Sequence, residues 1–121
     1  MKKSLVGLFM MLAACVSWQS SANAVQTTYK VAHIKVQSVN MVFIKVRSDF
    51  FLQDDKTKAR WYSLLQSCSS SANLAGEVVA VANVNNRLVW YGPKKWSTFM
   101  STTNMSWVDT RVNKQLSCDY G

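Results

Sequence analysis

The chain has 121 residues, a size that accommodates one domain. Its 14 lysines and arginines exceed its 6 acidic residues, giving a formal net charge of +8. One histidine and three cysteines are too few to predict a metal centre, so we expect neither a metal nor a cofactor. The four glycines form no glycine-rich run, which excludes a phosphate-cradling loop.

The N-terminus predicts export. Residues 1–3 are Met-Lys-Lys, and the apolar residues 4–14 match the hydrophobic region of a secretory signal peptide. This run is shorter than the roughly 20 apolar residues of a transmembrane helix. The cleavage pattern Ala-Asn-Ala at residues 22–24 predicts a signal peptide over residues 1–24 and a periplasmic or secreted domain over residues 25–121. The alternative is the lipoprotein pattern Leu-Ala-Ala-Cys, which would leave the protein lipid-anchored at Cys15.

Two cysteines, Cys68 and Cys118, remain after cleavage. In an oxidising compartment such a pair predicts one disulfide. Its loop of roughly 50 residues would contribute about 4 kcal/mol in the chain-entropy model. Loss of Lys2 and Lys3 reduces the 14 basic residues to 12 against 6 acidic ones, so the mature domain carries a net charge of +6.

The first half of the domain predicts a β-hairpin. Residues 31–37 and 41–47 alternate apolar and polar side chains, and residues 38–40 can turn the chain. The inner positions are Ala32, Ile34 and Val36 in the first strand and Val42, Ile44 and Val46 in the second. Phe43 shares the outward side with Met41, so we expect that face to be covered as well.

One amphipathic helix follows the hairpin. Asp54 or Asp55 can cap its N-terminus, because a carboxylate accepts hydrogen bonds from the free amides of the first turn. Gly76 can supply a left-handed conformation at its end. The apolar stripe at helical spacing consists of Trp61, Leu64, Leu65, Cys68 and Ala72.

The second half predicts more strands. Residues 77–84 and 87–91 are rich in β-branched and aromatic side chains, and Asn85-Asn86 suits a tight turn because asparagine tolerates positive φ. Residues 94–104 fit either an edge strand or a short helix over the sheet, and residues 106–112 alternate as a strand does. The expected fold is a single small α+β domain with an antiparallel sheet, in the order β-β-α-β-β-β.

Residues capable of catalysis are sparse. His33 lies on the polar side of a strand, and no nucleophile motif accompanies it. The spacing of the acidic residues does not pair two of them for glycoside hydrolysis, so we predict no enzyme activity. The acidic residues are Asp49, Asp54, Asp55, Glu77, Asp109 and Asp119.

Aromatic and basic side chains gather in one short segment. Trp90, Tyr91, Lys94, Lys95 and Trp96 are the candidate partner-binding residues, because tryptophan-rich clusters are preferred contact points for protein partners. The alternative interpretation makes Trp90 a core residue and the two lysines a solvated turn. Export argues against nucleic acid as the partner. The net charge favours an acidic protein or an anionic envelope glycan.

In its signal peptide, length and disulfide, the chain resembles small periplasmic immunity proteins that neutralise cell-wall-degrading effectors of type VI secretion, and periplasmic lysozyme inhibitors. That resemblance implies a protein that binds and blocks a secreted hydrolase. The order of strands and helix also looks like the oligosaccharide-binding barrels of toxin B subunits. This alternative implies a glycan-binding subunit or adhesin, with tryptophans as sugar platforms and a homo-oligomeric ring.

Overall fold

The structure is a computed structural model that describes residues 27–118. The signal peptide predicted over residues 1–24, with both of its processing patterns, lies outside the described residues, as does Asp119. The strands are β1 (Thr28–Val36), β2 (Val39–Lys45), β3 (Glu77–Val84), β4 (Arg87–Tyr91) and β5 (Lys114–Ser117). They form one sheet in the order β4-β3-β2-β1-β5.

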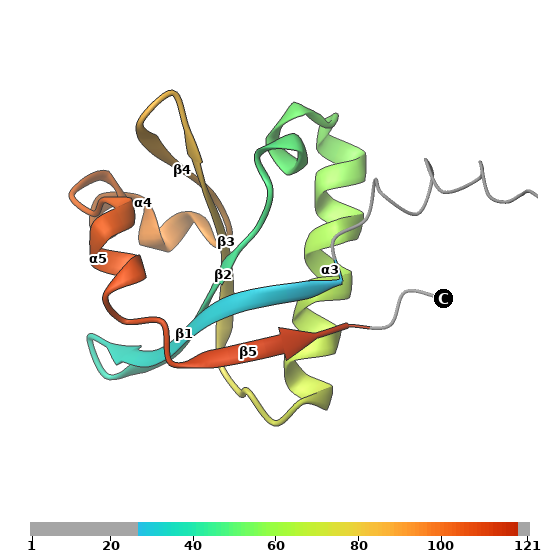
Figure 1. The fold of residues 1–121 in the computed structure, drawn as a ribbon, viewed down its shortest axis with the longest axis vertical. Coiled ribbons are helices and arrows are strands. Elements are labelled where there is room, and N and C mark those ends of the chain that lie inside the picture. The colour runs from blue at the N-terminus through green and yellow to red at the C-terminus, as the bar shows by residue number, and fades with distance from the viewer. Residues whose placement is uncertain (1–26, 119–121) are drawn as a thin grey trace, which may run out of the picture.

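Helices cover both faces of this sheet (Figure 1). The long helix α3 (Asp55–Ser71) lies on one face, preceded by the 3-10 turn η2 (Ser48–Leu52). The other face carries three short elements, η3 (Lys94–Trp96), α4 (Ser97–Ser101) and α5 (Met105–Asp109). The predicted α+β class, single domain and amphipathic helix are confirmed.

The sheet is antiparallel except at one pair. β2 and β3 run parallel. The connection between them contains α3, which crosses one face of the sheet and returns the chain to the end at which β2 began. The strands β4 and β5 form the two edges, so the sheet is open. The toxin-subunit resemblance implies a barrel, whereas the described strands form an open sheet.

Two-residue turns set the register of both hairpins. The first turn is at Gln37 and Ser38, with φ of 52° and 69°, earlier than the predicted residues 38–40. The resulting register places Ala32 and Val36 on the face of Phe43, so the prediction that they share an inner face with Val42 and Ile44 is wrong. The second is the predicted Asn85-Asn86 turn, with φ of 53° and 63°. Positive φ at both positions gives the turn a twist that matches that of the flanking strands.

The core has two layers, one on each side of the sheet. Val42 and Ile44 pack toward α3, while Met41 and Phe43 pack toward α4 and α5, and all four are fully buried. The second face of β2 is therefore covered, as expected from Phe43. Burial of each such side chain contributes roughly 1.5–3 kcal/mol.

The helix α3 begins as predicted but is rotated relative to the predicted stripe. The Asp54 carboxylate accepts a hydrogen bond from the Thr57 amide at 2.8 Å and caps the helix. Leu65 is buried, whereas Leu64 is 44% exposed and Ala72 is also exposed, so the predicted stripe is wrong at these two positions.

The last turns of α3 bury a serine on the side that faces the sheet. Ser69 is fully buried, and its hydroxyl donates a hydrogen bond to the Leu74 carbonyl at 2.6 Å, so this buried polar group has a partner. Asn73, with φ of 64°, provides the left-handed residue after the helix instead of Gly76. Gly76 has another role, because a Cβ there would lie 2.6 Å from the Asn40 carbonyl oxygen.

The strand predicted over residues 106–112 is wrong. This segment holds α5, whose first turn is capped by the Asn104 side chain. Val108 is fully buried and its neighbour Trp107 packs edge-on against Phe43. These two consecutive side chains belong to the same core layer, whereas successive side chains of a strand point to opposite faces. Residues 94–104 form η3 and α4 over this face, the helical alternative of the prediction.

The last strand, β5, pairs with β1 and leads directly to Cys118. The predicted disulfide is present, with the Cα atoms of Cys68 and Cys118 5.8 Å apart. It joins α3 to the β5 edge and closes the α3 face of the domain.

Candidate interaction surface

Two of the predicted contact residues point to opposite faces of the sheet. Tyr91 packs on the α3 side, with its ring centroid 5.4 Å from that of Tyr62 and 5.8 Å from that of Phe50. Trp90 packs against the core of the other face. Successive residues of a strand alternate in this way, so these two aromatic rings cannot form one platform.

The remaining three residues surround Glu77 at the start of β3. Trp96 is only 4% exposed, and its indole Nε1 donates a hydrogen bond to one carboxylate oxygen of Glu77 at 2.7 Å. Lys95 Nζ contacts the other oxygen, also at 2.7 Å. The hydrogen bonds from Lys95 and Trp96 hold the pKa of Glu77 below its usual value.

The predicted segment therefore does not form one binding surface. Trp96 is a core residue that fastens η3 to the sheet, and Lys95 is held by Glu77. Lys94 is exposed. The alternative interpretation, with Trp90 in the core and the lysines in a solvated turn, describes Trp90 and Lys94 more closely.

Each described carboxylate has a partner within the domain. Asp49 pairs with Arg47, Asp55 with Lys58, and Asp109 with Lys45. Glu77 binds Lys95, and Asp54 caps α3 with its pKa lowered by the hydrogen bonds from Thr57. The domain therefore carries positive charge that its own carboxylates do not balance. Several cations make no ion pair within the described part of the chain: Lys30, Lys35, Lys56, Arg87, Lys94, Arg111 and Lys114.

Two lysines stand next to each other at an uncovered corner of the sheet. The β1–β2 register pairs Val31 with Ile44, and its continuation places Lys30 opposite Lys45. On the other side of β1, Lys30 pairs with Gln115 of β5. The three side chains thus form a row across three strands, on the face that α4 and α5 cover elsewhere.

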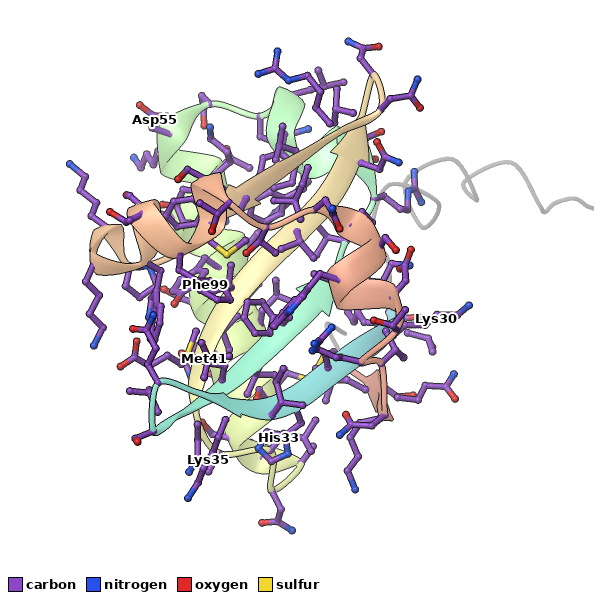
Figure 2. All side chains as sticks on the ribbon, turned by 90° about the vertical axis from the view of Figure 1, so that its left-hand side faces the viewer. Lys30, His33, Lys35, Met41, Asp55 and Phe99 are labelled. Atoms are coloured by element: carbon purple, nitrogen blue, oxygen red, sulfur yellow. A yellow bond between two sulfur atoms is a disulfide. The ribbon has the colours of Figure 1, made fainter. Side chains whose placement is uncertain are left out.

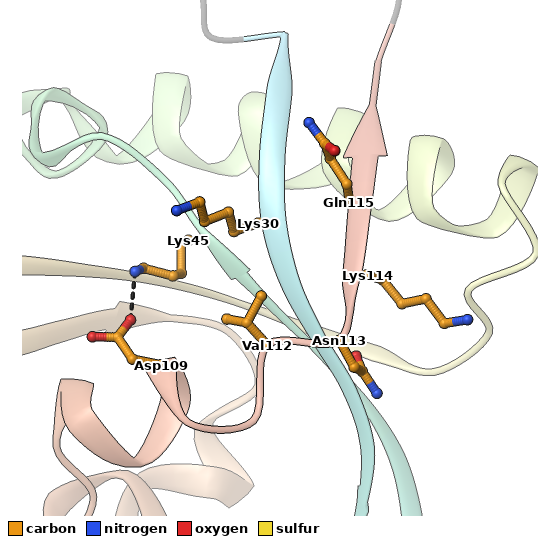
Figure 3. Close-up of a pocket in the computed structure, with 7 residues that line it drawn as sticks. All are labelled: Lys30, Lys45, Asp109, Val112, Asn113, Lys114 and Gln115. Atoms are coloured by element: carbon orange, nitrogen blue, oxygen red, sulfur yellow. Dashed lines mark hydrogen bonds and ion pairs between the residues drawn. The ribbon is translucent and has the colours of Figure 1, made fainter.

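This row lines a shallow groove of about 850 Å³ (Figure 3). Lys30 and Lys45 extend to the same side of the sheet, whereas Lys114 points away from them. The groove continues past Arg47 as a second hollow of about 340 Å³ that shares Lys30, Lys45 and Gln115. We call the surface around the row of Lys30, Lys45 and Gln115 the lysine groove.

The end of α5 sets the boundary of the lysine groove. Asp109, the last residue of α5, forms an ion pair with Lys45. The chain then returns to β5 through Asn113, whose side chain accepts a hydrogen bond from the His33 amide at 2.8 Å and donates one to the His33 carbonyl at 3.0 Å. The helix thus stops before it covers Lys30, and the return to β5 is fixed in place.

The lysine groove was missed in the sequence because the first strand was predicted to begin at residue 31. It begins at Thr28, and the same alternation extended backwards puts Lys30 on the face of Ala32. The cross-strand neighbour Lys45, however, depends on the register, which local alternation does not specify.

His33 is half-buried, and its ring Nε2 lies 2.9 Å from the Ala75 carbonyl oxygen.

Within residues 27–118, no group of three His, Cys, Asp or Glu side chains could hold a metal ion. No helix in the same range is both long and apolar enough to cross a membrane.

A search of protein-family models, of curated proteins and of solved structures finds no match to this chain.

Proposed function

We propose that the protein is an exported inhibitor of the immunity type, which binds an acidic surface of a secreted cell-wall hydrolase and blocks it. The observation that carries this proposal is the distribution of charge. The described carboxylates are engaged within the domain, while many cations, including Lys30 of the lysine groove, have no carboxylate partner there. An unneutralised basic surface attracts an acidic partner and raises the rate of association.

The type of target follows from the chemistry of glycan cleavage. Glycoside hydrolysis requires a pair of carboxylic residues beside the scissile bond, so the clefts of such enzymes carry negative charge. A basic inhibitor is complementary to such a cleft. The same requirement argues against a hydrolase activity in this chain, because Asp49, Asp55, Glu77 and Asp109 are each held in an ion pair.

The scaffold suits an inhibitor for a second reason. Its sheet is packed on both faces, and the Cys68–Cys118 disulfide joins its helix to an edge strand. A surface that is rigid before binding loses less conformational entropy on association.

The test is an inhibition assay with the exported, disulfide-bonded protein and a panel of purified two-carboxylate peptidoglycan hydrolases from bacterial effectors and lysozymes. We expect stoichiometric inhibition of at least one enzyme, with an affinity that falls as salt increases, because the contact is electrostatic. A protein that inhibits none of them but binds defined sugars on a glycan array would contradict the proposal and support the glycan-binding alternative.

A further inference from the structure

Resting on the proposed function, we infer that the lysine groove is where a carboxylate side chain of the acidic protein partner binds, and that Asp109 occupies part of this site in the free protein. The partner carboxylate replaces Asp109 at Lys45 and also contacts Lys30. Asp109 is thus an internal competitor of the partner.

The first support is the arrangement of charge. Two lysines directly opposite each other on antiparallel strands repel, which destabilises the pair. Asp109 compensates at Lys45 only, and Lys30 makes no ion pair with a described carboxylate. A partner carboxylate that takes the place of Asp109 and lies between the two ammonium groups would compensate both lysines, whereas Asp109 compensates only Lys45.

The second support is the construction of the site. Lys30, Lys45 and Gln115 project from three adjacent strands, so the sheet backbone fixes their spacing. Gln115 adds an amide that can donate a hydrogen bond to a carboxylate oxygen. The Lys45 side chain is 30% exposed and that of Asp109 48%, so their ion pair is accessible to a competing group.

The extent of the lysine groove favours a protein carboxylate over an anionic polymer. A polymer would need cations that continue in line beyond the lysine pair. Lys114 lines the groove, but its ammonium group points away from those of Lys30 and Lys45 (Figure 3). Arg47, which lines the adjoining hollow, is paired with Asp49 at 3.0 Å. The facing lysines therefore suit a single carboxylate, which is the group that Lys45 already binds in Asp109.

The test compares variants that change the net charge equally. Asp109→Asn removes the competitor, and Asp55→Asn removes one negative charge from an ion pair on α3. Lys30→Gln removes a groove cation, and Lys35→Gln removes one from the opposite end of β1 (Figure 2). The probe is a tetra-aspartate peptide titrated into ¹⁵N-labelled protein, with thermal unfolding used to verify that each variant folds.

We expect Asp109→Asn to tighten peptide binding about two- to fivefold relative to Asp55→Asn, the range that corresponds to one exposed ion pair. Lys30→Gln should weaken it by a similar factor relative to Lys35→Gln, with the peptide-induced shifts centred on residues 30, 45 and 115. Equal affinities within either matched pair would overturn the inference. So would binding of a polyphosphate chain, and not of the peptide, that depends on Lys30.

The same variants in the inhibition assay separate this inference from the proposed function. If the wild-type protein inhibits a hydrolase and all four variants inhibit it equally well, the function stands and the groove assignment is overturned. If the peptide affinities change as expected but no hydrolase is inhibited, the groove binds carboxylates and the proposed function fails.

Discussion

The two faces of the sheet are closed in different ways. On one face a single capped helix, α3, runs along the sheet and is joined to the β5 edge by the Cys68–Cys118 disulfide (Figure 1). On the other face, short elements are held by aromatic contacts and leave the lysine groove uncovered. The long helix and its disulfide cover one face of the sheet, whereas the short helices cover the other face only where their side chains join the core.

The largest expected effect comes from removing the aromatic anchor of the short helices. Phe43 contacts Phe99 and Trp107, so Phe43→Ala should lower the free energy of unfolding by about 3–5 kcal/mol. Hydrogen exchange should accelerate most in residues 97–113. The control is Ile44→Ala on the α3 face, which is equally buried and should cost about 2–5 kcal/mol without a local effect on α4 and α5. Identical exchange patterns for the two variants would show that the two faces are not independent.

Removal of the disulfide tests the other face. Replacing both Cys68 and Cys118 with serine should lower the stability by about 2–4 kcal/mol, chiefly because the unfolded chain is no longer constrained. Amide exchange should increase in β5 and in the last turns of α3, and much less in α4. Faster exchange centred on α4 and α5 would contradict the assignment of the disulfide to the α3 face.

A smaller effect is expected at the link between η3 and the sheet. Glu77→Gln removes the ion pair with Lys95 and weakens the hydrogen bond from Trp96. The folded pKa of Glu77 is lowered, so its contribution to stability is complete above the unfolded value near 4.5 and is lost as pH falls through the folded pKa.

The measurement is a set of thermal unfolding curves for wild type and Glu77→Gln. The two should differ at pH 7, and the difference should shrink as pH falls below 4.5 and the wild-type carboxyl becomes protonated. Asp55→Asn, which breaks an exposed pair on α3, serves as the control and should have little effect at either pH. A difference for Glu77→Gln that persists unchanged at low pH would mean that the charge of Glu77 is not its source.

The smallest effect should come from Leu64, which the sequence pattern assigned to the buried stripe. Because Leu64 is 44% exposed, Leu64→Ala should change the stability by less than about 0.5 kcal/mol. Its neighbour Leu65 is buried, and Leu65→Ala should cost about 2–5 kcal/mol. Chemical denaturation distinguishes the two, and similar losses would mean that α3 has the orientation predicted from its apolar stripe.

Local signals were sufficient where each pattern allowed only one structure. The strands at residues 77–84 and 87–91 were predicted with their correct ends, because the Asn85-Asn86 turn between them needs residues that tolerate positive φ. For a similar reason the start of α3 was predicted at Asp54 or Asp55, and Asp54 is the residue that caps it. Residues 106–112 were mistaken for a strand because a short run of mixed apolar and polar residues fits both periods.

The candidate site depends on contacts between residues far apart in the chain more than the strands and the helix start do. The aromatic-basic segment near residue 90 was conspicuous in composition, but strand alternation separates Trp90 from Tyr91, and Glu77 draws Trp96 into the core. The lysine groove combines residues from β1, β2, β5 and the end of α5, which are far apart in the chain.

The sequence by itself determined the α+β class, the disulfide pair, the hairpin of residues 77–91 and the start of the long helix, because alternation, capping and turn chemistry act between near neighbours. Only the tertiary structure decided the parallel β2–β3 pair, the rotation of α3, the helical form of α5 and the position of the lysine groove. These features follow from register and from the competition of side chains for two core layers, and both involve residues distant in the chain.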